Sequence, residues 1–355
     1  MKRNNLLILA LLQLFVFHGC IEVIDFDTER DGGSIVIDGS VTEGTGPFAI
    51  RLRETASTDR ITYPVSGALI TLFDDAGNSG AYQESADDPG RYILPSGVMT
   101  GIPGRAYHVE IEMPNGRIYQ SEPETMPRLA GVQDSIYFEF GFKDFLNDIG
   151  NPVTKPIVNA YINAAIDQQP GEDLFFKWDV EEVYLLSPTD FPDPFGSIPP
   201  PCFVYEYPSG QDFQLFDGRE SRSAAVQGLR VATQIVGFNF TEKHYFSVYQ
   251  IGMTEKAFDY WSKIRQTVAN VGTIFDTPPA PVQGNVFNPS DPDETVLGYF
   301  GVEARDTIRA YVLPSDLHVT VLKECEYRPW VNDYPDRCLD CLSVPNSTHK
   351  RPDFF

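Results

Sequence analysis

The chain has 355 residues and a formal net charge of −23 at pH 7, with 50 acidic residues against 27 Lys and Arg. The acids are scattered through a sequence that is 13% aromatic, which indicates a folded acidic surface and excludes a disordered acidic segment. Such a surface argues against nucleic acid and anionic lipid headgroups as electrostatic partners, and the length suffices for one large or two ordinary domains.

Residues 1–19 form the first predicted segment, a signal peptide. Lys2 and Arg3 precede an apolar run over 6–17, too short for a comfortable membrane span, and Gly19-Cys20 follows. This order resembles a bacterial lipoprotein signal cut before Cys20. Cys20 is therefore the predicted lipidation site, and residues 20–33 are the predicted lipidated tether. The alternative is an ordinary cleaved signal followed by a structural cysteine.

Residues 34–127 are predicted to form a β-sandwich domain of the Ig-like or transthyretin-like kind. Short alternating segments separated by turn residues recur at 34–38, 48–53, 68–74, 90–94, 106–113 and 117–121. Asn115-Gly116 lies between the last two of these segments, where it predicts a hairpin turn. The pattern around Gly90-Arg91-Tyr92 also resembles carboxypeptidase-regulatory sandwiches.

Residues 128–325 are predicted to form a larger β-rich domain. Strand-like segments occur at 135–140, 157–165, 174–186, 229–240 and 245–251. The prolines of residues 187–201 are too frequent for regular structure and predict a loop that ends at Cys202. Residues 296–302 and 307–313 are expected to pair as a hairpin that turns across 303–306.

One amphipathic helix is predicted over residues 254–271. Thr254 suits the N-cap, Gly272 suits the end, and apolar residues from Ala257 to Val271 repeat at spacings of four and three. The helix should therefore lie on a sheet. Trp261 is interpreted as a core residue, with ligand stacking as the alternative.

Four cysteines besides Cys20 are disulfide candidates: Cys202, Cys325, Cys338 and Cys341. An even number in an exported chain predicts two disulfides, of which three pairings are open. Because three of the four lie near the end, residues 326–355 are expected to form a disulfide-stapled tail. The alternatives at Cys338–Cys341 are a zinc site or a redox pair.

No catalytic residue, metal site or cofactor is predicted, and the protein is interpreted as a non-enzyme. His108, His244, His318 and His349 occur in unrelated contexts, and the usual hydrolase, metalloprotease and phosphate-binding motifs are absent from the sequence. Asp291, Asp293 and Glu294 are the calcium alternative, but their spacing lacks an EF-hand pattern, so they are interpreted as solvated acids.

Several segments together resemble one family. These are Gly19-Cys20, Gly90-Arg91-Tyr92, 278–281 (PPAP), 284–289 (GNVFNP), 296–300 (VLGYF), 338–341 (CLDC) and 350–355 (KRPDFF). They resemble the domain-of-unknown-function 4249 lipoproteins of Bacteroidota. The resemblance implies a lipid-anchored protein of the outer membrane, commonly found beside TonB-dependent transporters. It carries over no catalytic residue.

Three functional hypotheses follow. The first is a binding or accessory lipoprotein for nutrient capture or uptake, whose partners are outer-membrane lipid through Cys20 and a TonB-dependent barrel. The second is a structural or assembly lipoprotein that makes protein–protein contacts, and the third is a glycan or peptide hydrolase. The ligand is not identified by the sequence. Acids after Cys20 resemble surface-export signals, which favours the cell surface, with a plain solvated linker as the alternative.

Overall fold

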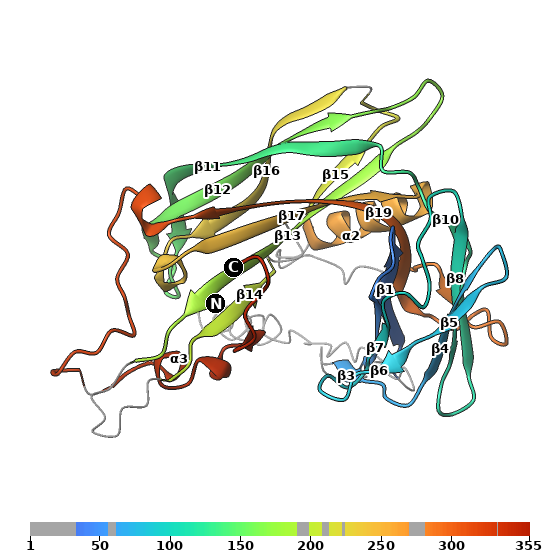
Figure 1. Ribbon diagram of the computed structural model, residues 1–355, viewed down its shortest axis with the longest axis horizontal. Helices are drawn as coiled ribbons and strands as arrows, with labels where there is room; N and C mark the ends of the chain where they lie inside the picture. The colour runs from blue at the N-terminus through green and yellow to red at the C-terminus, as the bar shows by residue number, and fades with distance from the viewer. Residues whose placement is uncertain are drawn as a thin grey trace, which may run out of the picture.

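The computed structural model in Figure 1 describes residues 33–55, 62–189, 199–207, 213–221, 224–269, 281–331 and 333–355. The predicted signal peptide and the lipidation site Cys20 lie outside these residues. The described chain is mainly β, as predicted, and forms sheets of eleven, six and three strands. Its α-helices are α2 (Glu255–Ala269) and the short α3 (Asp336–Leu339). Neither helix is long and apolar enough to cross a membrane.

The first part of the chain forms a β-sandwich. One layer is the N-terminal part of the eleven-stranded sheet: β1 (Ile35–Thr42), β2 (Phe48–Thr55), β3 (Thr62–Pro64), β6 (Gln83–Glu84) and β7 (Arg91–Leu94). The other layer is the six-stranded sheet: β4 (Leu69–Asp74), β5 (Ser79–Ala81), β8 (Ala106–Glu112), β9 (Ile118–Ser121), β10 (Glu124–Thr125) and β18 (Val286–Phe287).

Alternation of apolar and polar residues explains how these two layers pack. Ile35 and Ile37 on β1, and Ile50 on β2, are at most 1% exposed and point toward the other sheet. The predicted hairpin turn at Asn115-Gly116 is confirmed, because β8 pairs with β9 across it. Gly116 adopts a φ of 81°, a backbone conformation that few other residues adopt without strain.

The second part of the chain is also a two-layered β structure. Its three-stranded sheet consists of β11 (Gly131–Leu146), β12 (Pro152–Ile166) and β16 (Ala225–Ile235). The facing layer belongs to the eleven-stranded sheet and consists of β13 (Phe175–Leu186), β14 (Cys202–Glu206), β15 (Gln214–Asp217), β17 (His244–Met253), β19 (Leu297–Val312) and β20 (Ser347–Thr348). Trp178, Phe246 and Ile162 are among the residues of the apolar core between the layers.

Strand β19 joins the two parts, and this corrects the predicted hairpin across 303–306. Residues 297–303 pair in parallel with β1, and residues 304–312 pair antiparallel with β17. The segment Glu303-Ala304-Arg305-Asp306 carries no glycine, proline or asparagine, and each residue keeps a partner in a neighbouring strand. The chain therefore continues straight through the expected turn.

The division that the sequence indicates at residue 127 does not separate two independent sheets. β18 and the first half of β19, both distant in sequence, complete the first sandwich. Val286, Phe300 and Val302 are at most 3% exposed within its core. Figure 1 shows β19 running from the second part into the first beside β1.

The backbones of β19 and β1 approach one another closely at Gly298. Gly298 pairs opposite Ile37 and has a φ of 88°, and a side chain there would overlap the Ile37 carbonyl oxygen. Gly284 in turn lies against the Gly298 carbonyl oxygen. Glycine at both positions is required by this spacing.

Helix α2 lies on the sheet, as predicted. The Thr254 hydroxyl accepts a hydrogen bond from the Ala257 backbone N–H at 3.2 Å, which confirms the predicted N-cap. Ala257 and Phe258 are buried against Phe175 and Ile251. The predicted residues 270 and 271 lie outside the part of the chain that the structure describes.

Both expected disulfides form, and the structure decides their pairing. Cys202 bonds to Cys341 and Cys325 bonds to Cys338, with Cα–Cα distances of 5.8 and 5.0 Å. The first bond ties β14 to the tail, where β20 also pairs with β14. Farther along, the ring centroid of Phe355 lies 4.9 Å from those of Phe203 and Tyr245. The tail is thus packed along one edge of the sheet.

Candidate functional site

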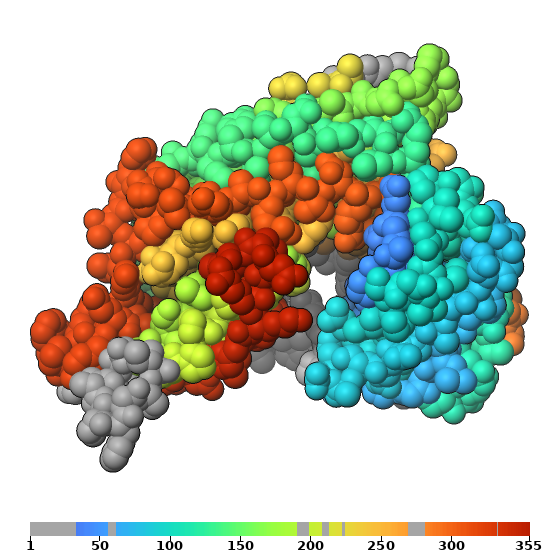
Figure 2. All heavy atoms as spheres, viewed as in Figure 1, coloured from blue at the N-terminus to red at the C-terminus, as the bar shows by residue number. Residues whose placement is uncertain are grey.

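The eleven-stranded sheet bends so that one face is concave. Figure 1 shows the first sandwich and the C-terminal tail on either side of this bend, and Figure 2 shows a hollow between them. A cleft of about 660 Å³ lies on the concave face, with contributions from β1, β2, β13, β19 and α2. The volume is in the range of ordinary ligand pockets, roughly 300–1,000 Å³.

The charge of this cleft differs from that of the whole chain. Its lining includes the bases Arg51, Arg91, Lys177 and Arg305 and the acids Asp38, Asp179 and Glu303. Bases thus slightly outnumber acids here, whereas acids outnumber bases almost two to one in the sequence. The lining of the cleft is therefore less acidic than the chain as a whole, although Arg51, Lys177 and Arg305 are each paired with a carboxylate.

Lys177 on β13 lines the cleft beside Trp261 of helix α2. The residue is only 5% exposed, and its Nζ lies 2.8 Å from an Asp179 carboxylate oxygen. The same Nζ lies 3.6 Å from the ring centroid of Trp261, close enough for a cation–π interaction worth on the order of 1–2 kcal/mol. Lys177 therefore fixes the orientation of Trp261.

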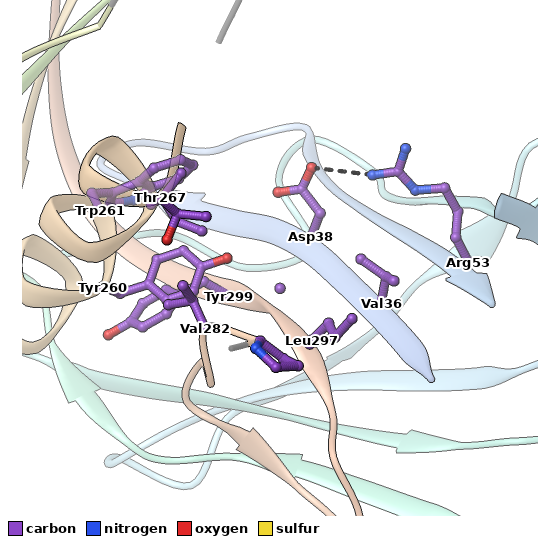
Figure 3. A pocket seen from close by; sticks show the side chains of 12 residues that line it. Val36, Asp38, Arg53, Tyr260, Trp261, Thr267, Val282, Leu297 and Tyr299 are labelled. Atoms are coloured by element: carbon purple, nitrogen blue, oxygen red, sulfur yellow. Dashed lines mark ion pairs between the residues drawn. The ribbon is translucent and has the colours of Figure 1, made fainter. Parts of the chain in front are cut away.

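A second cavity of about 540 Å³ adjoins the cleft, since Asp38, Trp261 and Tyr299 line both. Its walls are mainly apolar and aromatic, from Val36, Tyr260, Trp261, Ile264, Pro281, Val282, Leu297 and Tyr299. We call it the aromatic cavity. Figure 3 shows Tyr260 and Tyr299 lying against one another on one side, with Asp38 and Arg53 across the space.

The aromatic rings contact one another in a fixed arrangement. The centroid of Tyr260 lies 4.8 Å from that of Tyr299 and 5.4 Å from that of Trp261. Burial raises the pKa of Tyr260 to about 12, and the nearby Asp38 carboxylate adds to the rise. The Tyr260 hydroxyl is therefore a neutral hydrogen-bonding group at neutral pH.

Glu124 does not line the aromatic cavity but contacts Tyr299, which does. It is 4% exposed and accepts hydrogen bonds from the hydroxyls of Tyr299 and Thr254 and from the Asn285 amide. Burial raises the pKa of Glu124, and these hydrogen bonds oppose the rise. One side chain on β10 thereby holds Tyr299 of β19 and the N-cap of α2 together.

No sequence pattern predicts this site. The helical spacing predicts Trp261 as a core residue, but it lines both cavities, so the alternative of a ligand-contacting residue has a structural basis. Asp38 and Arg53 are isolated charged residues in strand-like segments, Glu124 follows such a segment, and no local pattern distinguishes the three from surface residues. Asp38 and Arg53 reach the cavity only because β1 pairs with β2 and with β19.

The cysteines and histidines lie elsewhere. Cys338 and Cys341 belong to different disulfides, so they form neither a redox pair nor a thiolate zinc site. His349 Nδ1 lies 3.6 Å from Cys202 Sγ and 3.1 Å from the Pro201 carbonyl oxygen. Since both sulfurs beside it are bonded to one another, they offer no thiolate to a metal.

Of the other histidines, His244 is fully buried. Its Nδ1–H donates to the Asn239 carbonyl at 3.0 Å, and its Nε2 lies 2.7 Å from Glu182. The rings of His244 and Phe240 stack with their centroids 4.1 Å apart, so His244 is a packed core residue, and it lines neither cavity. His108 stacks on Phe73, and His318 lies edge-on to Phe140.

The acidic turn that was the calcium alternative is held by hydrogen bonds. Glu294 accepts hydrogen bonds from Arg117 at 3.0 Å and from the Tyr119 hydroxyl at 2.7 Å, and the Asn288 amide also donates to it. These groups attach the turn before β19 to β9. Glu294 therefore has a structural role that the sequence pattern did not indicate.

Comparison with known proteins identifies the family. A family model described as a domain of unknown function (DUF4249) matches residues 21–309, which is most of the chain. The chain therefore belongs to the DUF4249 family. The match includes every residue that lines the cleft and the aromatic cavity, and it ends before Cys325. No curated protein matches the chain.

Proposed function

We propose that this DUF4249 protein is an outer-membrane lipoprotein that captures a small molecule in its concave cleft. It is anchored through lipid on Cys20 and acts as an accessory component beside a TonB-dependent transporter. Support for the anchor comes from the order of Lys2, Arg3, the apolar run and Gly19-Cys20. Support for the transporter comes from the family resemblance drawn from the sequence.

The observation that carries the binding role is the aromatic cavity opening onto the charged cleft. Three aromatic side chains line the cavity, and charged groups lie at its margin. A mostly apolar concavity with a few polar groups is the usual form of a small-molecule site. Since β19 is hydrogen-bonded in both parts of the chain, the walls of the cleft are connected through one continuous strand.

The anchor is tested by replacing the lipidation site. After an alkaline carbonate wash, which releases proteins held only by other proteins, Cys20→Ala should be found in the soluble fraction, because the lipid would be its only direct attachment to the bilayer in this proposal. Thr28→Ala serves as the matched control, since it changes a residue of the same predicted tether that is not proposed to carry lipid. A Cys20→Ala protein that still sediments with membranes contradicts the anchor.

The partner is tested by affinity purification from native membranes in mild detergent. The affinity epitope belongs in the exposed turn at Asn115-Gly116, because a fusion after Phe355 would disturb its packing on Phe203 and Tyr245. A TonB-dependent barrel recovered in stoichiometric amount supports the proposal. Recovery of the lipoprotein without a barrel contradicts it.

An assembly role is the second candidate, favoured by the tip of the β11–β12 hairpin. Phe142, Leu146 and Ile149 are 61%, 74% and 81% exposed there. Large apolar side chains exposed on neighbouring parts of one hairpin are typical of protein contacts. Leu146→Ser with Ile149→Ser should then abolish recovery of the barrel. Leu69→Ser, at a residue 68% exposed on the first sandwich, is the matched control.

A further inference from the structure

Arg53 is the least satisfied charged group at the aromatic cavity. Its guanidinium donates no hydrogen bond within the part of the chain that the structure describes, and its Nε is buried without a partner. The side chain is 36% exposed and lines the cavity. A guanidinium presents five N–H donors in a planar fork that matches a carboxylate. Arg53 is thus arranged to receive an anionic group from a ligand.

Asp38 is the complementary group on the neighbouring strand. Its closest contact with Arg53 is 3.9 Å, which exceeds hydrogen-bond distance, and its side chain is 64% exposed. Among the described residues, no hydrogen bond to the Asp38 carboxylate is formed. The two charges therefore lie side by side with their hydrogen-bonding capacity unused. The ion pair is drawn as a dashed line in Figure 3.

Arg51, two residues before Arg53 on β2, differs from Arg53 because its donors already have a partner. Arg51 is on the same face of β2, but both of its terminal nitrogens donate to Asp88, at 3.0 and 2.6 Å. Arg51 is therefore already occupied by a bidentate ion pair. Arg53 alone of the two has its donors available at the cavity.

We propose that the aromatic cavity binds the zwitterionic headgroup of an α-amino acid that carries a large apolar side chain. The ligand carboxylate pairs with Arg53 and the ligand ammonium pairs with Asp38, while the side chain packs among Tyr260, Trp261 and Leu297. This proposal names the ligand of the aromatic cavity, which opens onto the cleft, so it rests on the proposed binding function.

Adjacent opposite charges distinguish this ligand from a simple anion or cation. A lone carboxylate on Arg53 would lie beside the like charge of Asp38, and a lone cation on Asp38 would lie beside Arg53. In an α-amino acid the ammonium and carboxylate are on the same carbon, so both protein charges are matched at once.

The test is isothermal titration calorimetry on the full-length protein in mild detergent. The probes are L-phenylalanine, N-acetyl-L-phenylalanine, which lacks the positive charge, and L-phenylalaninamide, which lacks the negative one. We expect each derivative to bind at least about tenfold more weakly than phenylalanine, because each loses one charge-assisted hydrogen bond. Equal affinity for the three probes, or no binding of phenylalanine at about 10 mM, overturns the proposal.

Two variants assign the charges. In Asp38→Asn, phenylalanine and its N-acetyl derivative should bind alike, while discrimination against the amide remains. In Arg53→Gln, phenylalanine and the amide should bind alike, while discrimination against the N-acetyl derivative remains. Arg265→Gln, on an exposed position of α2, is the control and should leave all three affinities unchanged. The assigned pairs are contradicted if one variant no longer distinguishes phenylalanine from either derivative, or if a variant still distinguishes phenylalanine from both.

The outcome is separable from that of the proposed function. If the transporter co-purifies but phenylalanine does not bind, the accessory role stands and the ligand assignment is wrong. If phenylalanine binds with the expected discrimination but no transporter co-purifies, the ligand assignment stands and the partner is wrong. The probe comparison on the unmodified protein does not depend on whether a variant folds.

Discussion

Breaking the two disulfides one at a time should reveal which one stabilises the fold more. The Cys202–Cys341 bond closes a loop of 139 residues, and the Cys325–Cys338 bond closes one of 13 residues. A cross-link restricts the unfolded chain, and the loss of entropy grows with the logarithm of loop length. The resulting contributions to the free energy of unfolding are about 5 and about 3 kcal/mol at 25 °C.

We therefore expect Cys202→Ala with Cys341→Ala to cost about 2 kcal/mol more than Cys325→Ala with Cys338→Ala. Alanine avoids burying an unpaired hydroxyl, since Cys202, Cys338 and Cys341 are at most 1% exposed. The first pair also ties the tail to β14, so its loss should free the packing of Phe355 on Phe203 and enlarge the difference.

The assay is urea denaturation followed by tryptophan fluorescence, since Trp178 is 2% exposed in the second core. Peptide mapping of the non-reduced protein should first recover the Cys202–Cys341 and Cys325–Cys338 peptides. If the variant that lacks the short loop is the less stable one, loop-closure entropy does not dominate and the reasoning is wrong. If mapping recovers other pairs, the pairing itself is refuted.

Three further predictions concern pH, close backbone approach and the tail. Burial raises the pKa of Asp74, but hydrogen bonds from Asn78, Arg105 and Ala76 outweigh it and lower that pKa to about 2 from 3.8. The free energy of unfolding should therefore fall as pH decreases from about 4 toward 2, and it should fall less steeply in Asp74→Asn. The same dependence of the free energy of unfolding on pH in both proteins would contradict this. Gly298→Ala should lower the free energy of unfolding in urea by more than about 3 kcal/mol, because the new side chain would overlap β1. Gly97→Ala should lower it less, because Gly97 has a similar φ of 83° but open space around it. Equal costs would exclude the overlap with β1. Removing Phe354 and Phe355 should cost about 1–3 kcal/mol, measured by thermal melting, and an unchanged melting temperature would show that their packing adds nothing.

The site could be predicted only in part, because its residues are joined by long-range pairing. Helix 254–271 is recognisable from its cap and its apolar spacing, and the structure places it from 255 to 269. Nothing in that spacing tells which sheet it covers. Asp38, Arg53 and Tyr299 meet because β1 pairs with β2 on one side and with β19 on the other, across more than 240 residues of sequence.

The sequence by itself determined the mainly β class, the Asn115-Gly116 hairpin, the amphipathic helix at 255–269 and the presence of two disulfides. These features depend on residues close in sequence, or on cysteine number. The tertiary structure decided the course of β19, the disulfide pairing and the cavity at Arg53, because each depends on which strands meet. The free energy of such pairings comes from side chains packed across the whole fold, and a local pattern does not contain it.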